Sequence, residues 1–151
     1  MQISDLFRRK TPATESPTTM EDSVFGRIER GKDAWMARKY FRPVRREIDI
    51  RIESGVDGPT QAQRDLYRRI EDEYDGLLGQ YRAFFLEQYG PLPDGTSVEE
   101  LFDSLQFQYI GLPDVTESPT IWEMVFTTDL EDHVMIPRFT DMTFLAEGWD
   151  G

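Results

Sequence analysis

Apolar and polar residues alternate strictly along segment 46–53, which is the clearest strand pattern in the chain. Ile48, Ile50 and Ile52 fall on one side of an extended backbone, and charged residues fall on the other. This period of two predicts a half-buried strand in an antiparallel sheet with one face in water. Two preceding stretches, 24–30 and 34–41, flank a turn-like sequence beginning at Gly31 and predict a β-hairpin.

A long amphipathic helix is predicted next. Thr60 followed by Gln63 has the spacing of a capping box, so we expect the helix to begin there. Apolar residues then recur every three or four positions as far as Gln88. This stripe consists of Leu66, Tyr67, Ile70, Tyr74, Leu77, Leu78, Tyr81, Phe84 and Phe85, with Tyr89 just beyond. Gly76 lies inside the pattern, and because glycine costs up to about 1 kcal/mol against alanine in a helix, a break there stays open.

The second half of the chain predicts one short helix followed by strands. Ser97 is an N-cap residue with acids in the turn that follows it. Strand patterns follow at 107–110, 120–127, 134–139 and, more weakly, 143–145. Strand blocks on both sides of a helical middle predict an α+β fold, with a mainly antiparallel sheet and both helices packed on one face.

Composition divides the chain into a tail and a single domain. The segment TPATESPTT at 11–19 lacks the apolar area needed to offset the entropy of ordering, so residues 1–20 are predicted to be a disordered N-terminal tail. The remaining 21–151 match one domain of ordinary size. The absence of cysteine suits a cytoplasmic protein. The chain has no apolar run of about 18 residues, so no membrane partner is expected.

Charge is distributed unevenly along the sequence. Residues 1–82 hold 16 basic and 15 acidic side chains, whereas 83–151 hold Arg138 alone against 14 acidic ones. Such a field repels phosphate backbones and attracts cations, which disfavours nucleic acid and favours a basic protein as partner, although acids also serve solubility. The candidate contacts are Glu99, Glu100, Asp103, Asp114, Glu117, Asp129, Glu131 and Asp132.

Common catalytic and cofactor-binding motifs are missing. The chain has one histidine, no cysteine and none of the usual glycine-rich nucleotide-binding, serine-hydrolase or zinc-protease motifs, so no cofactor is expected. Asp129, Glu131 and His133 are spaced by two residues. If the segment is extended, the three side chains share one face and could bind a divalent ion or work as an acid and base. A polar connection between two strands would give the same pattern.

Several segments together resemble a bacterial domain family of unknown function that is related to predicted immunity proteins of polymorphic toxin systems. The matching pieces, in order, are Val24-Phe-Gly26 with Trp35, Ile48-Asp-Ile-Arg-Ile52, Gly58-Pro-Thr-Gln-Ala-Gln63 before the long helix, Asp129-Leu-Glu-Asp-His133 and Gly148-Trp-Asp150. In that family a glycine is expected after the acidic segment, whereas this chain has Val134 there and the additional acid Asp132. The resemblance implies protein inhibition and supplies no catalytic residues.

Three functional hypotheses follow from these patterns. The first is a protein-binding module, in its sharpest form an immunity-type inhibitor whose acidic surface meets a basic partner. The second is a metal-assisted or carboxylate-based enzyme that uses Asp129, Glu131 and His133. The third is a housekeeping adaptor without a charge-driven partner. The absence of catalytic motifs favours the binding module over the enzyme.

Overall fold

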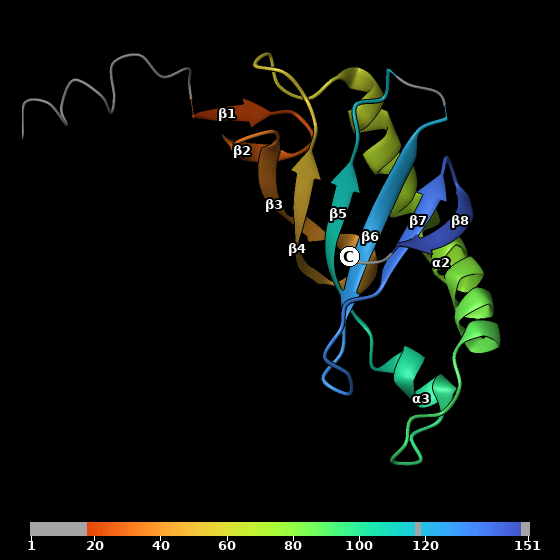
Figure 1. The fold of residues 1–151 in the computed structure, drawn as a ribbon. Helices are drawn as coiled ribbons and strands as arrows, with labels where there is room; N and C mark the ends of the chain where they lie inside the picture. The colour runs from red at the N-terminus through yellow and green to blue at the C-terminus, as the bar shows by residue number, and fades with distance from the viewer. Residues whose placement is uncertain (1–17, 117–118, 149–151) are drawn as a thin grey trace, which may run out of the picture.

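Eight strands form one sheet in which every strand lies beside its neighbours in the sequence (Figure 1). The computed structural model describes residues 18–116 and 119–148. The strands are β1 (Thr19–Asp22), β2 (Gly26–Arg30), β3 (Trp35–Phe41), β4 (Arg46–Ile52), β5 (Gln106–Leu112), β6 (Ile121–Thr127), β7 (Ile136–Thr140) and β8 (Thr143–Gly148). The helical elements are η1 (Arg42–Val44), α2 (Gln61–Gln88) and α3 (Val98–Asp103). The predicted α+β class is confirmed.

One pair of neighbouring strands is parallel, and it explains where the helices lie. β4 and β5 run in the same direction, whereas all other neighbouring pairs are antiparallel. A parallel pair needs a long connection that returns the chain to the starting edge, and α2 and α3 supply it. Figure 1 shows α2 behind the sheet and α3 at its lower end. No helix of the described residues covers the opposite face of the sheet.

The core lies between the sheet and α2 and is rich in aromatic rings. The apolar side of β4, which includes Ile48, Ile50 and Ile52, is at most 2 % exposed. From α2, Tyr74 stacks against Phe107 of β5 at a ring-centroid distance of 5.4 Å, and Tyr81 stacks against Phe126 of β6 at 5.9 Å. Ring pairs of this kind contribute about 0.5–1.5 kcal/mol beyond the area they bury.

Gln63 joins the helix to both parallel strands. Its side-chain oxygen accepts a hydrogen bond from the Thr60 amide, and Thr60 Oγ1 accepts one from the Gln63 amide, which completes the predicted capping box. The Gln63 Nε2 atom donates to the carbonyls of Glu53 and Pro113, at 2.7 and 2.9 Å. These two residues follow β4 and β5, so one fully buried amide ties together the helix start and both strand ends.

A buried ion pair ties the first hairpin to the same helix. The side chain of Asp22, which is 2 % exposed, accepts hydrogen bonds from the amides of Val24 and Phe25. It also accepts bonds from Nε and Nη2 of Arg64, at 2.9 and 2.7 Å. Burial alone would raise the pKa of Asp22, but these donors hold that pKa below its ordinary value. The turn after β1 is therefore fastened to α2 by charge as well as by packing.

The structure adds detail that periodicity did not predict. β1 begins at Thr19, so Thr19 and Met20 belong to a strand and not to the predicted tail; most of that tail lies outside the described residues. α2 runs without interruption through Gly76. β8 extends three residues further than predicted, to Gly148. β7 begins at Ile136, later than predicted, and Met135 forms an isolated bridge with Phe126.

Replacing Gln63 should destabilise the fold strongly. Gln63→Met keeps the approximate length of the side chain but leaves two carbonyls and one amide without their partner. We expect the free energy of unfolding, measured by urea denaturation, to fall by about 3 kcal/mol. Gln61→Met is the matched control, since Gln61 is exposed and contacts other side chains only, and it should cost less than about 0.5 kcal/mol. Equal losses in the two variants would contradict this role.

The Asp22 pair should make stability depend on acid. Because the folded state lowers the pKa of Asp22, its contribution is complete above the ordinary value of about 3.9 and disappears as the pH falls through the folded value. Asp22→Asn should therefore lose about 2 kcal/mol at pH 7 by urea denaturation and progressively less below about pH 4. Asp72→Asn, which breaks an exposed pair with Arg42, should cost at most about 1 kcal/mol. A loss that did not change with pH would argue against the charged pair.

Candidate functional site

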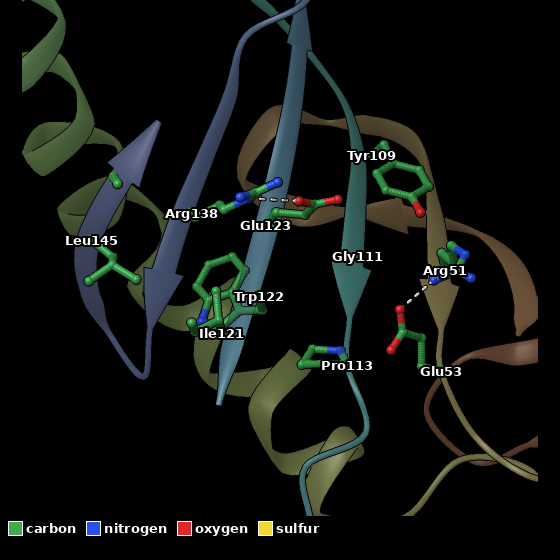
Figure 2. Close-up of a pocket in the computed structure, with 11 residues that line it drawn as sticks. Arg51, Glu53, Tyr109, Gly111, Pro113, Ile121, Trp122, Glu123, Arg138 and Leu145 are labelled. Carbon is green, nitrogen blue, oxygen red and sulfur yellow. Dashed lines mark hydrogen bonds and ion pairs between the residues drawn. The ribbon is translucent and has the colours of Figure 1, made fainter. Parts of the chain in front are cut away.

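A groove of about 400 Å³ crosses the uncovered face of the sheet from β4 to β8 (Figure 2). Its walls combine charged, aromatic and aliphatic side chains: Arg51, Glu53, Tyr109, Gly111, Pro113, Ile121, Trp122, Glu123, Arg138, Leu145 and Ala146. Most of these residues belong to strands. Alternate side chains of a strand point to opposite faces, and Arg51, Glu123 and Arg138 lie at positions that point away from α2. A rigid sheet therefore positions the groove.

Two ion pairs lie in the groove, with Tyr109 near both. Arg51 Nη1 is 2.6 Å from Glu53 Oε1, and Arg138 Nε is 3.4 Å from Glu123 Oε2. Burial raises the pKa of Tyr109 to about 12, although the adjacent Arg51 opposes this shift. The tyrosine hydroxyl is therefore protonated at neutral pH and is available as a hydrogen-bond donor. Each carboxylate of the groove already has a guanidinium partner, an arrangement suited to recognition more than to proton transfer.

Two glycines give the second ion pair its space. A Cβ atom built at Gly111 would lie 3.1 Å from Cγ of Glu123. A Cβ atom built at Gly148 would lie 2.7 Å from Nε and Cζ of Arg138. The guanidinium group of Arg138 therefore occupies space beside Gly148 that the Cβ atom of any other residue would fill.

Apolar side chains gather on the same face as the groove. Six large apolar side chains among the described residues are exposed: Met36, Tyr40, Val56, Ile121, Leu130 and Leu145. Ile121 and Leu145 line the groove. Met36 pairs with Arg51 and Tyr40 pairs with Glu47 across β3 and β4, which places both on the uncovered face. Four of the six thus lie on one side of the sheet, two of them on β3 and two on β6 and β8.

Most of the predicted acidic contacts lie together at one end of the sheet. Glu99, Glu100 and Asp103 belong to α3, and Asp129, Glu131 and Asp132 belong to the connection between β6 and β7. The hydroxyls of Ser104 and Thr128 are 2.6 Å apart and join these two segments. Figure 1 shows both segments at the lower end of the molecule. We call these six residues the acidic end.

The other two predicted contacts do not belong to this group. Asp114 follows Leu112, where β5 has run from the acidic end to the opposite end of the sheet. Glu117 lies outside the described residues. Arg82 is a basic side chain near the acidic end, with its guanidinium carbon 5.8 Å from the centroid of the Phe102 ring.

Asp129, Glu131 and His133 do not form the extended ligand set considered as an alternative. The segment between β6 and β7 is a turn followed by a bend, so the three side chains do not share a strand face. Glu131 and His133 do approach each other, with Oε2 and Nε2 3.1 Å apart. Within residues 18–116 and 119–148, no group of three acidic, histidine or cysteine side chains is arranged to hold a metal ion.

The sequence analysis did not predict that the Glu147 carboxylate joins β8 to α2 beside the acidic end. Glu147 of β8 accepts hydrogen bonds from the hydroxyls of Tyr81 and Tyr89, the first at 2.6 Å. Burial and the bond to Glu147 raise the pKa of both tyrosines, which stay protonated and hold β8 against the C-terminal part of α2. Tyr81 and Tyr89 are 66 and 58 residues from Glu147 in the sequence, so no local sequence pattern predicts these contacts.

Gly148→Ala should alter the groove without unfolding the protein. The added methyl group would displace the guanidinium group of Arg138 and separate it from Glu123. Because this pair is partly exposed, we expect stability to change by no more than about 1 kcal/mol. A crystal structure of the variant should show the pair broken. Gly79→Ala, at an open position in α2, is the control and should leave the pair intact while stabilising the helix. An unmoved Arg138 in Gly148→Ala would contradict this account.

Comparisons with known proteins identify no relative of this chain. No helix of the described part has the length and apolar character needed to cross a membrane. The sequence matches no family model, and neither the curated proteins nor the solved structures compared with it give a match. The groove, the apolar side chains around it and the acidic end are the surface features that bear on its function.

Proposed function

We propose that this chain is a protein-binding module whose acidic end engages a basic surface of its partner. The observation that carries the proposal is the meeting of acids from two separate segments, α3 and the β6–β7 connection, at one end of the sheet. Such a concentration of one sign of charge accelerates encounter with a partner of the opposite sign and suppresses unsuitable partners.

The uncovered face of the sheet supplies the second part of the binding surface. Charge alone gives steering and selectivity, whereas affinity comes mostly from a few buried aromatic, aliphatic and arginine contacts. Tyr40, Ile121 and Leu145 on this face, together with Arg51 and Arg138 in the groove, provide side chains of those kinds. The partner thus meets the acidic end first and packs against the uncovered face afterwards.

An immunity-type inhibitor of a basic toxin is the sharpest form of this proposal. The acidic end supports it, as does the resemblance to the toxin-immunity families drawn from the sequence. A housekeeping adaptor that uses the uncovered face without the acidic end is the alternative within the same class. The metal-assisted form of the enzyme hypothesis loses its support, because Asp129, Glu131 and His133 lie in a turn and a bend and form no metal-holding group within the described residues. The carboxylate-based form keeps only the contact between Glu131 and His133.

A charge-reversal experiment tests the proposal. The tagged protein is used to capture partners from lysate of its native host at low and at high salt, and the bound proteins are identified by mass spectrometry. We expect a basic protein that is retained at low salt and weakened at high salt. Glu99→Lys, Asp129→Lys and Asp132→Lys introduced together should reduce its affinity by at least about tenfold, because three attractive contacts become repulsive.

The matched control reverses three exposed acids at the other end of the sheet. Asp33, Asp57 and Asp114 replaced by lysine change the net charge by the same amount and should leave the affinity within about threefold. If both triple variants lose affinity equally, net charge and not the acidic end determines binding. If the partner binds independently of salt and of both sets of changes, the adaptor alternative replaces the charge-driven proposal.

A further inference from the structure

The sheet has two free edges, β1 and β8, which are its first and last strands. The outer side of an edge strand presents N–H and C=O groups that can pair with a strand of another chain, so proteins shorten such strands, charge them or cover them. β1 is four residues long and carries the exposed Glu21. β8 is six residues long, so it offers the longer edge for pairing.

β8 has no exposed charge to protect its edge. Its one charged residue is Glu147, whose carboxylate is bound by two tyrosine hydroxyls of α2. Leu145 and Ala146 are exposed and uncharged. The register with β7 shifts beside Leu145, so this irregularity does not shield the start of the strand. A different device is needed there.

Gln80 of α2 binds the backbone at the start of β8. Its Nε2 atom donates to the carbonyl of Met142 at 3.1 Å, and its Oε1 atom accepts from the amide of Phe144 at 2.8 Å. Met142 and Phe144 flank Thr143, which pairs with Thr140 of β7. Successive residues of a strand direct their N–H and C=O groups to alternate sides, so the Phe144 amide lies on the side of β8 that has no neighbouring strand.

The side-chain amide of Gln80 imitates the backbone of a strand residue. A primary amide offers the same kinds of donor and acceptor as a peptide group. In a parallel ladder, one residue donates to the carbonyl that precedes its opposite residue and accepts from the amide that follows it. Gln80 makes this pair of bonds around Thr143. The position that an additional strand would take at the start of β8 is therefore occupied by α2.

We infer that Gln80 closes the β8 edge to strand addition and prevents β8 from pairing with β8 of a second copy of this chain. An antiparallel β8–β8 pair about a twofold axis places the same residues on both sides, so each copy supplies the groups that the other needs. No exposed charge on β8 would repel the second strand. This role concerns the edge of the sheet and does not depend on the proposed protein-binding function.

Analytical ultracentrifugation of the full chain tests the inference. Gln80→Ala removes both hydrogen bonds to β8. We expect this variant to form a dimer with a dissociation constant of about 100 μM or below, whereas the unsubstituted chain should show no such association at the same concentrations. Gln88→Ala, at the exposed end of the same helix, is the matched control and should sediment like the unsubstituted chain. If Gln80→Ala associates no more than Gln88→Ala, the inference is wrong.

Two further substitutions of Gln80 separate its hydrogen bonds from its place in the helix. Gln80→Leu keeps the helix preference but has neither donor nor acceptor, so it should associate as Gln80→Ala does. Gln80→Glu keeps the acceptor for the Phe144 amide and adds a charge at the edge, so it should not associate. Because Gln80 is exposed, all three variants should keep the far-ultraviolet circular dichroism of the unsubstituted chain. Equal association of Gln80→Glu and Gln80→Ala would contradict the inference.

Hydrogen exchange at the Phe144 amide locates the contact between copies. In the unsubstituted chain this amide is bound by Gln80, so its exchange should be slow at every protein concentration. In Gln80→Ala the exchange should be fast in dilute solution and slow again in concentrated solution, because the second β8 then accepts the hydrogen. A dimer of Gln80→Ala in which the Phe144 amide stays unprotected would place the contact elsewhere and overturn the inference.

A charge added to β8 should reverse the effect of Gln80→Ala. Leu145 is 50 % exposed, and Leu145→Lys would bring like charges together across a β8–β8 pair. The double variant Gln80→Ala, Leu145→Lys should therefore sediment like the unsubstituted chain. Val56→Lys combined with Gln80→Ala is the control, since Val56 is exposed outside β8, and this combination should still form the dimer. Association that persists with Leu145→Lys would exclude β8 as the contact.

Discussion

The buried amide of Gln63 is the interaction on which the arrangement of the sheet depends. Parallel strands cannot be joined by a tight turn, so β4 and β5 need an external connection to keep their register. Gln63 supplies part of that restraint, since its Nε2 atom binds the chain just after both strands while its Oε1 atom caps the helix between them. Residues of β4 and β5 line the groove on the uncovered face, so the relative position of these two strands helps to set the shape of the groove.

Much of the fold could be predicted because its signals are local. The alternation of Ile48, Ile50 and Ile52 and the capping box at Thr60 depend on neighbouring residues, and both are present in the structure. β1 was missed because its strand is only four residues long and follows a segment of polar composition. The helix continues through Gly76 because the flanking turns bury Tyr74 and Leu77, which outweighs the weak helix preference of one exposed glycine.

The binding surfaces could be predicted only in part, because they depend on which segments meet. The acids of the second half were visible in the sequence, but their division between two ends of the sheet follows from the direction of β5. Arg51, Tyr109 and Arg138 looked like ordinary strand residues until the order of strands placed them around one groove.

The sequential order of the strands also has a consequence for how the chain folds. β1 to β4 and β5 to β8 form two meanders whose contacts join neighbours in the sequence, so each meander closes only short loops. The single pairing that must bring distant segments together is the one between β4 and β5. Because rates of folding fall as the sequence separation of contacts grows, we expect the docking of the two meanders onto α2 to limit the rate. The parallel pair of β4 and β5 thus lies at the centre of the native sheet, and its formation is the step that we expect to limit the rate of folding.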